Sequence, residues 1–274
     1  MRGACRTARR DGKRLGFVPT MGALHEGHLS LVRSAKASCD IVAASIFVNP
    51  AQFGPNEDLA TYPRSFERDR ELLEKEGADL LFAPTVEEMY PRGAVTWVTV
   101  EELSDKLDGA SRPGHFRGVT TVVSKLLNIA EPDAAFFGQK DAAQVAIVRR
   151  MVRDLCLTVE IVACPIVREP DGLAMSSRNS YLDTQQRRQA PILYRSLMLV
   201  KKLADMGERN TAKLIAAARE EFRREPSVRL DYLEIVNPDS LDAVQDVQQG
   251  GLVAVAAYVG KTRLIDNLVL PGIT

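Results

Sequence analysis

The stretch Leu15-Gly-Phe-Val-Pro-Thr-Met-Gly-Ala-Leu-His25-Glu-Gly-His28 decides how this chain of 274 residues is interpreted. It begins with a short apolar run, passes through a turn that contains glycine, and leads into an amphipathic segment over residues 27–38. A buried strand followed by a helix is the repeating unit of a parallel sheet covered by helices. The stretch therefore predicts that an α/β fold begins here, with the turn at the carboxyl end of the first strand.

The same alternation of short apolar runs and amphipathic segments continues to about residue 163. This pattern predicts a doubly wound parallel sheet with helices on both faces. We expect further strands at residues 41–48, 79–83, 95–100, 133–137 and 158–162, and further helices at 65–76, 118–130 and 140–155.

The pattern changes after about Pro165, where a polar stretch is followed by two helical segments and three strand-like runs. Helices that precede a group of strands favour a smaller α+β domain. We expect the helices at residues 183–206 and 211–224 and the strands at 230–236, 252–259 and 263–270. The sequence thus predicts two domains, residues 1–166 and residues 167–274.

Composition limits the classes of partner. Lys plus Arg and Asp plus Glu both number 36, so the chain lacks the basic field that holds nucleic acid or an anionic membrane surface. The longest apolar runs, residues 41–48 and 252–259, are far shorter than the roughly 20 residues that span a bilayer. We expect a soluble protein that binds neither nucleic acid nor membrane, and any anion must be held by a local site.

The first 14 residues are basic, and no apolar stretch follows them as a signal peptide would require. We expect a solvated, partly disordered terminus there rather than a targeting signal. The chain has 4 cysteines, scattered without the spacing of a metal site or a disulfide framework, and this usage is typical of reduced thiols in a cytosolic protein.

The polar residues that follow the first strand form the most informative motif. His25 and His28 are three residues apart and share one face of the first helical turn if the helix begins near His25. Gly22 and Gly27 would let a ligand approach the backbone. Two imidazoles beside free backbone N–H groups would bind phosphate and stabilise charge in a transition state. A hydrogen-bonded pair with no function is the alternative for an isolated His-x-x-His, and the position after the first strand favours the phosphate site.

Polar residues follow other strands in the same way. Asn49 and Gln52 close the second strand as neutral hydrogen-bonding groups, although a simple turn would also place them there. Lys140 and Asp141 open a helix, where a lysine is electrostatically unfavourable unless an anion is bound, and Gln144 shares their face. A surface Lys–Asp pair is the alternative interpretation.

Two loops complete the set of candidate segments. Residues 108–118 are rich in glycine and long for a simple connection, although a plain connecting loop is the alternative interpretation. Met175-Ser-Ser-Arg178 lies in a polar stretch just after the predicted domain boundary. Its hydroxyls and guanidinium suit phosphate, and such loops often close over nucleotides.

In combination, His25-Glu-Gly-His28, Val48-Asn-Pro-Ala-Gln-Phe53, Gly138-Gln-Lys-Asp141 and Met175-Ser-Ser-Arg178 resemble the pantoate–β-alanine ligase family. The first element is similar to the HIGH-type motif of nucleotidylyltransferases and class I aminoacyl-tRNA synthetases, and the last is similar to the KMSKS loop. The resemblance implies a Rossmann-like nucleotide domain with a smaller C-terminal domain, arranged as a cytoplasmic homodimer. It also implies condensation of pantoate with β-alanine through a pantoyl-adenylate, with ATP split to AMP and pyrophosphate and Mg²⁺ as cofactor.

The resemblance also implies roles for individual residues. His28, as a proton donor, and His25, Lys140 and Arg178, as charge stabilisers, would be catalytic. Pantoate would be held by Gln52 and Gln144, with Asn49, Tyr62, Arg112 and His115 nearby. ATP would contact Met21, Gly22, Ala23, Leu24, His25, Glu26, Gly27, His28, Gly138, Gln139, Lys140, Asp141, Val167, Met175, Ser176, Ser177 and Arg178.

Asp69 is the candidate outer-shell partner of Mg²⁺, which the triphosphate would largely hold. A solvated helix face is the alternative account of Asp69.

Two other functions remain open at this point. A nucleotidylyltransferase would share the histidine pair, but it needs a cationic acceptor pocket, which the neutral Gln52 and Gln144 do not favour. A non-catalytic nucleotide-binding regulator would have lost polar motif residues that are all present here. Family members usually carry a further strand and helix before Gly16, of which only the helix end resembles residues 4–13. We therefore expect a less stable edge of the sheet and an unaltered site.

Overall fold

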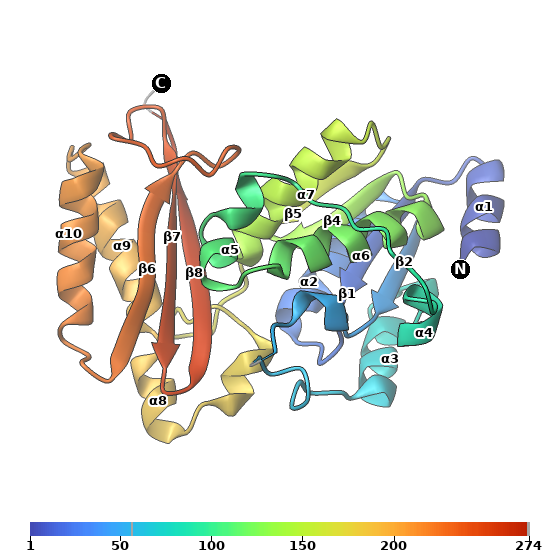
Figure 1. The fold of residues 1–274 in the computed structure, drawn as a ribbon, viewed down its shortest axis with the longest axis horizontal. Helices are drawn as coiled ribbons and strands as arrows, with labels where there is room; N and C mark the ends of the chain where they lie inside the picture. Colours follow the sequence, from blue (N-terminus) through green and yellow to red (C-terminus); the bar gives the residue numbers. More distant parts are fainter. Residues whose placement is uncertain (56, 273–274) are drawn as a thin grey trace.

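The computed structural model describes residues 1–55 and 57–272, in which two separate sheets form (Figure 1). The first is parallel throughout, in the order β3-β2-β1-β4-β5, which confirms the predicted doubly wound, Rossmann-like sheet. Its strands are β1 (Leu15–Thr20), β2 (Ile41–Ile46), β3 (Leu80–Phe82), β4 (Ala134–Gly138) and β5 (Glu160–Cys164).

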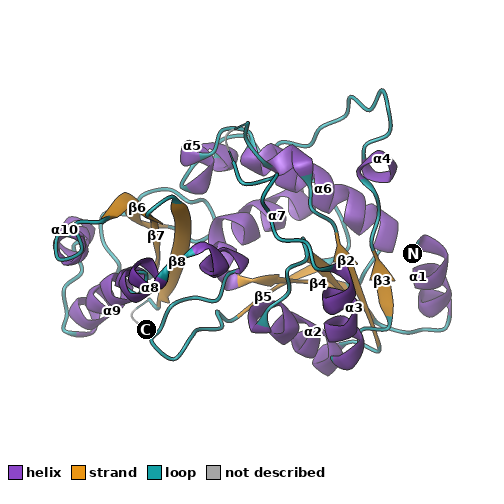
Figure 2. Cartoon of the chain, turned by 90° about the horizontal axis from the view of Figure 1, so that it is seen from below, coloured by secondary structure: helices purple, strands orange, loops and turns teal. Residues whose placement is uncertain are grey.

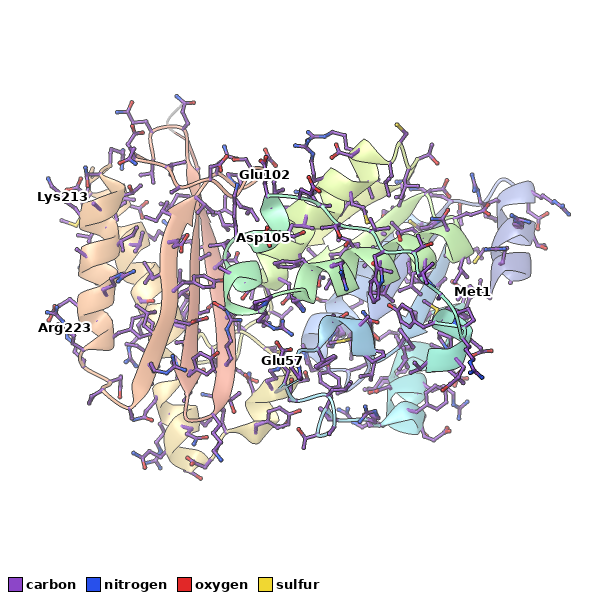
Figure 3. The ribbon with its side chains drawn as sticks, viewed as in Figure 1. Met1, Glu57, Glu102, Asp105, Lys213 and Arg223 are labelled. Atoms are coloured by element: carbon purple, nitrogen blue, oxygen red, sulfur yellow. The ribbon has the colours of Figure 1, made fainter. Side chains whose placement is uncertain are left out.

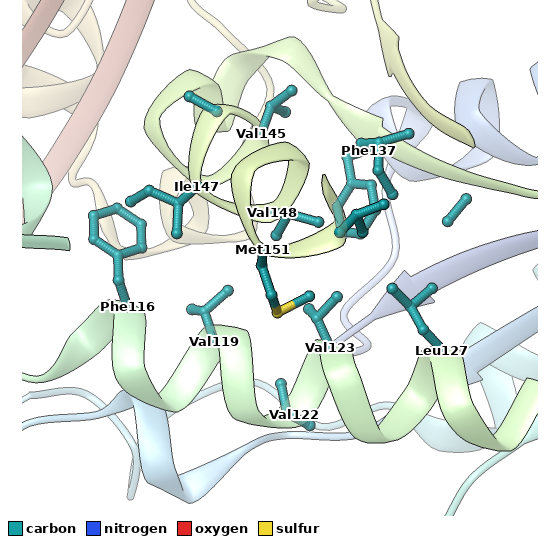
Figure 4. Close-up of a cluster of buried hydrophobic side chains, with 14 of the residues drawn as sticks. Phe116, Val119, Val122, Val123, Leu127, Phe137, Val145, Ile147, Val148 and Met151 are labelled. Atoms are coloured by element: carbon teal, nitrogen blue, oxygen red, sulfur yellow. The ribbon is translucent and has the colours of Figure 1, made fainter. Parts of the chain in front are cut away.

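Helices cover both faces of this sheet, with α2 (Glu26–Ser38) and α3 (Phe66–Lys75) on one face and α6 (His115–Ala130) and α7 (Ala142–Asp154) on the other (Figure 2). Val32 and Ala35 of α2 are fully buried in the core of the first face. On the second face, Phe116, Val119 and Val123 of α6 pack toward α7, as Figure 4 shows.

Shorter elements connect these layers. They are α4 (Val86–Met89) and α5 (Asp108–Ser111), with the 3-10 turns η1 (Pro50–Gln52), η2 (Leu103–Asp105), η3 (Gln139–Asp141) and η4 (Ser177–Tyr181). Helix α4 begins with a capping box between Thr85 and Glu88.

The second sheet is antiparallel and packs against two helices, which confirms the smaller α+β unit. Its strands are β6 (Val228–Val236), β7 (Gly251–Val259) and β8 (Thr262–Leu270), covered by α9 (Ile192–Asp205) and α10 (Thr211–Phe222) (Figure 1). The helix expected at residues 183–206 is divided into α8 (Thr184–Gln189) and α9, with Pro191 at the N-cap of α9. The domain boundary at residue 166 stays a prediction.

The strand expected at residues 95–100 is absent, and this prediction was wrong. The segment is rich in β-branched and aromatic residues, but the backbone of Val98 bonds to side chains of helix α6 in place of a neighbouring strand. Thr121 Oγ1 accepts from the Val98 N–H at 3.0 Å, and Thr120 Oγ1 donates to the Val98 carbonyl at 2.6 Å. Val95 and Trp97 remain 83% and 44% exposed.

The N-terminal residues form helix α1 (Arg2–Arg10), which corrects the expected solvated, partly disordered terminus. Cys5 is buried against the sheet core, and Arg6 and Arg9 pair with Glu131 at 2.9 and 3.4 Å. These contacts order a helix whose sequence alone is strongly polar. No helix within residues 1–55 and 57–272 is long and apolar enough to cross a membrane.

Gly118 packs directly against the backbone of η1 and yields a test of the packing. A Cβ on Gly118 would lie 2.2 Å from the Ala51 carbonyl oxygen and 2.6 Å from the Gln52 Cα, both of them backbone atoms. We expect Gly118→Ala to lower the free energy of unfolding by about 1–3 kcal/mol in urea denaturation, since backbone must shift. Gly3→Ala, where a Cβ meets nothing within 4 Å, is the control and should be neutral or stabilising. Equal stability of the two variants would contradict this account.

Candidate active site

A crevice opens where β1 and β4 end, at the point where the sheet order reverses. Most of the residues predicted for the site line it, and they come from five separate segments of chain. They are Met21, His25, Gly27, His28, Asn49, Gln52, Tyr62, Arg112, His115, Gly138, Lys140, Asp141, Gln144, Val167, Met175, Ser176, Ser177 and Arg178. Gly22, Ala23, Leu24, Glu26, Gln139 and Asp69 do not belong to this lining.

His25 and His28 form the cap of helix α2. His25 is the N-cap residue, its Nδ1 accepts from the Gly27 N–H at 3.2 Å, and His28 Nδ1 accepts from the His25 N–H at 3.4 Å. The ring centroids are 4.1 Å apart. Because both Nδ1 atoms accept, each neutral ring carries its proton on Nε2 and keeps one N–H to donate to a ligand.

Both rings are neutral at pH 7. Burial, together with the nearby His28 and Lys140, lowers the pKa of His25 to about 3. Burial and Lys140 lower the pKa of His28 to about 4, although Asp141 opposes this shift. The pair therefore supplies hydrogen-bond donors rather than full positive charges in the free protein.

Gly27 is required by the position of the His25 ring. A Cβ on Gly27 would lie 2.9 Å from His25 Cε1 and 3.0 Å from His25 Nδ1. Any side chain at residue 27 would therefore displace the imidazole from its capping position.

Asp69 supports the turn that leads into this helix. Its side chain is 1% exposed, and its two oxygens accept from the N–H groups of Ala23 and Leu24 at 2.7 and 2.9 Å. The alternative of a solvated helix face was wrong, because the carboxylate reaches from α3 into the turn between β1 and α2. Ala23 adopts a positive φ of 51° there, so the buried carboxylate holds a backbone shape that is otherwise unfavourable.

Asn49 orients Gln52 at the end of β2. Asn49 is 1% exposed, and its Nδ2 donates to Gln52 Oε1 at 3.0 Å and to the Gly118 carbonyl at 3.1 Å. Its Oδ1 accepts from the Tyr90 hydroxyl at 2.8 Å. Since Gln52 Oε1 is occupied, the Gln52 amide N–H₂ is the part that is left to meet a ligand.

Arg112 and His115 are engaged with the protein itself. His115 Nδ1 donates to the Gln52 carbonyl at 2.8 Å, and its Nε2 lies 3.0 Å from Arg112 Nη1. Arg112 also forms two hydrogen bonds with Glu57, at 2.9 and 2.6 Å. Burial and Arg112 lower the pKa of His115 to about 4, consistent with a neutral ring. These two residues therefore brace the turn that carries Gln52.

Arg178 is held in a similar way by Asp58, the residue that follows Glu57. Its Nε and Nη2 donate to the two oxygens of Asp58, both at 3.0 Å. Although burial opposes the shift, Arg178 lowers the pKa of Asp58 below its ordinary value. The Nη1 edge is not used by Asp58, so the guanidinium can contact an anion while it stays in this pair. Glu57 lies beside the gap between the two halves of the molecule in Figure 3.

Lys140 and Asp141 lie at the end of β4, with their charged groups 3.5 Å apart. Gln144 lines the crevice one turn further along α7. On the opposite wall, the Ser177 hydroxyl is 3.4 Å from the Tyr62 hydroxyl, which links the Met175–Arg178 segment to the first domain.

A metal ion would find few ligands in this site. Residues 1–55 and 57–272 contain no group of three or more His, Cys, Asp or Glu side chains arranged to hold one. The Asp69 oxygens already accept backbone N–H groups, and Asp141 is the carboxylate that faces the crevice. The residues suit a cation carried mainly by phosphate and water.

Three supporting residues were missed by sequence reasoning: Glu57, Asp58 and Asn267. Glu57 and Asp58 lie in a polar turn, and Asn267 lies in a strand of the other sheet. Nothing in their local pattern indicates a partner in a remote segment of the chain.

This chain is also similar in sequence to proteins of known function. A family model described as pantoate-beta-alanine ligase matches residues 1–269. A pantothenate synthetase of Acidobacterium capsulatum is 64% identical over 256 residues, which cover 93% of this chain and 86% of the relative. A pantothenate synthetase of Koribacter versatilis is 60% identical over 270 residues, or 98% of this chain and 93% of the relative.

Solved structures of pantothenate synthetases are similar to this chain in fold. The crystal structure of pantothenate synthetase from Thermus thermophilus has a TM-score of 0.91 and 52% identity, covering 93% of this chain and 92% of that one. That of pantoate-beta-alanine ligase from Francisella tularensis, complexed with beta-gamma ATP and beta-alanine, has a TM-score of 0.79 and 35% identity, covering 97% and 95%.

The protonation of the site can be tested directly, because the chain has only 3 histidines. We expect NMR titration of their ring protons to give pKa values near 3 to 4 for all of them, since burial disfavours each charged ring. An unfolded chain takes up these protons near pH 6.5, so stability is full above that pH and falls as the pH drops toward 4. Titration of His28 near 6.5 in the free protein would contradict this assignment.

Proposed function

The chain belongs to the pantoate–β-alanine ligase family and catalyses the ATP-dependent condensation of pantoate with β-alanine; we propose that the crevice described above is where this reaction occurs. The observation that carries this proposal is the meeting of His25, His28, Lys140 and Arg178 beside the neutral amides of Gln52 and Gln144. Family membership decides against the nucleotidylyltransferase and the non-catalytic regulator.

The first step forms the adenylate. The pantoate carboxylate attacks the α-phosphorus of ATP, a new oxygen–phosphorus bond forms, and the bond to the β-phosphate oxygen breaks to release pyrophosphate. Negative charge accumulates on the phosphoryl oxygens. The Nε2–H groups of His25 and His28 and the cations Lys140 and Arg178 stabilise it by hydrogen bonding and charge.

The second step forms the amide. The neutral amine of β-alanine attacks the acyl carbon of the adenylate, and AMP leaves with the oxygen that it shared with the acyl group. The nitrogen loses one proton, which the departing AMP phosphate takes up. No covalent bond to the protein is needed in either step. The side chains therefore act by position and charge rather than as nucleophiles.

Pantoate is held by the amide groups of the crevice. Asn49 turns the Gln52 N–H₂ toward the ligand, and Gln144 faces it from helix α7. Neutral amides bind the hydroxyl and carboxylate groups without the strong positive charge that would favour a phosphate in this position. Asn49, Arg112 and His115 then act through Gln52 rather than by contact with pantoate.

The adenylate must be protected from water until the amine arrives. The segment Met175–Arg178 covers one side of the crevice, tied to the first domain by the Arg178–Asp58 pair and the Ser177–Tyr62 contact. We assign protection of the adenylate to this segment, and we place the boundary between the two domains just before it, at residues 166 and 167.

Mg²⁺ belongs to the proposal through the family. It would be held by the triphosphate oxygens and water, with the crevice-lining Asp141 available to the ion's water shell and Asp69 acting only through the turn that it supports. The bound ion would neutralise charge on the leaving pyrophosphate.

A two-part assay tests the function. With ATP and Mg²⁺, we expect pyrophosphate release only when pantoate is present, and the amide product only when β-alanine is added. His28→Ala should lower kcat by about 100-fold or more, since one donor to the transition state is lost. Lys36→Ala, at the exposed end of the same helix, is the control and should keep normal turnover. Normal turnover of His28→Ala would remove His28 from the mechanism.

We propose a cytoplasmic homodimer, as the family resemblance implies, with the extended segment around Val95 and Trp97 in its interface. Trp97 stacks on Tyr90 and lies under the Arg117 guanidinium, so its partly exposed ring is held in place at the surface near the exposed Val95. An exposed aromatic group of this kind is typical of interface anchors.

The interface assignment predicts a change in assembly. We expect Val95→Lys to shift the protein from dimer to monomer in analytical ultracentrifugation, because a buried, unpaired charge opposes association. Val95 is 83% exposed in the single chain, so the fold itself should be unaffected. Met206→Lys, at a similarly open position in the second domain, should leave the dimer intact. A dimer that persists in Val95→Lys would exclude this surface.

A further inference from the structure

We propose that Asn267, a residue of the C-terminal sheet, is a positioning residue for the nucleotide because it fixes the backbone of Gln139 and Lys140. The inference rests on the proposed function of the crevice. Asn267 lies in β8, is 3% exposed, and does not itself line the crevice. Any effect that it has on ATP therefore passes through the segment that it holds.

Every hydrogen bond of the Asn267 side chain is directed at η3. Its Nδ2 donates to the carbonyl oxygens of Gln139 and Lys140, both at 2.9 Å. Its Oδ1 accepts from Gln139 Nε2 at 3.3 Å. The orientation of the amide is thus determined by its partners, because a flipped amide would place its oxygen against two carbonyl oxygens.

The turn Gln139–Asp141 needs the hydrogen bonds that Asn267 provides. The turn η3 connects β4 to α7, and its N-cap, Gly138, has no side chain to satisfy the turn. Lys140 must direct its ammonium group into the crevice from this turn, where it lies 3.5 Å from Asp141. With both carbonyls bound by Asn267, the Lys140 backbone is tied to the C-terminal sheet.

The preceding residue of β8 holds a second segment of the nucleotide site. Asp266 is also 3% exposed and pairs with Arg168 through two hydrogen bonds, at 2.6 and 3.0 Å. Asp266 Oδ1 accepts from the Asn267 N–H at 2.8 Å, which joins the two contacts. Arg168 follows Val167, whose carbonyl accepts from the Met175 N–H.

Two adjacent residues of one strand therefore hold both walls of the proposed ATP site. On the pantoate side, Gln52 is supported separately by Asn49, Arg112 and His115. Gln144 lies in helix α7, beyond the turn that Asn267 holds. The arrangement predicts that loss of Asn267 affects ATP and leaves pantoate binding unchanged.

The test compares Asn267→Ala and Asn267→Asp with the unaltered protein. We expect KM for ATP, and the Kd for ATP in calorimetry, to rise about tenfold in Asn267→Ala as buried carbonyls lose their partner. Asn267→Asp should have a larger effect, because its oxygens oppose both carbonyls. KM for pantoate should stay within about twofold in both variants.

The control is Asn210→Ala, which removes the N-cap of α10 in the same domain, where Asn210 Oδ1 accepts from the Lys213 N–H at 3.1 Å. It should lower Tm without changing KM for ATP. If Asn267→Asp does not fold, the KM and Kd values of Asn267→Ala test the proposal on their own. Unchanged ATP constants, or an equal rise in KM for both substrates, would overturn the proposal. The calorimetric Kd requires no turnover, so failure of the ligase reaction in the unaltered protein would be recognised separately.

Discussion

The reversal of strand order between β1 and β4 is the constraint on which the site depends. The chain leaves β1 toward β2 and leaves β4 toward β5, so α2 and α7 pack on opposite faces of the sheet. Their starts diverge at the carboxyl edge and leave a crevice between them. His25 and His28 occupy one start and Lys140 the other. Groups from remote parts of the chain therefore meet because the sheet places β1 and β4 side by side.

Hydrogen-bond satisfaction separates the residues that support the site from those that can meet a ligand. Asn49, Asp69 and His115 are buried, and their polar atoms are occupied by backbone or side-chain partners. A buried polar group that is already satisfied gains little from a substrate. His25 and His28 keep their Nε2–H groups, and Arg178 keeps one edge of its guanidinium. Proximity to the crevice is thus a weaker guide to function than the number of unused donors.

Local pattern was sufficient where the stabilising contacts are local or generic. The continuous apolar runs of β1, β2 and β7 predict buried strands because any such run must be covered on both faces. The same reasoning failed at residues 95–100, since a strand also requires a neighbour that pairs with it. It failed at the N-terminus because Cys5 and Glu131, not helix propensity, order the basic residues of α1. Neither partner can be identified from the local pattern around it.

The sequence by itself determined the fold class, the family, and the motifs that carry the chemistry, because these depend on periodicity and on residue types within a few positions. Tertiary structure alone decided what each motif residue is free to do. The neutral Nε2–H tautomers of the histidines, the bracing of Gln52 by His115, and the hold of Asn267 on Lys140 all depend on distances that only the folded chain sets. Hydrogen bonds act only within about 3 Å, so contacts between remote segments are specified by the folded backbone and not by the order of residues along it.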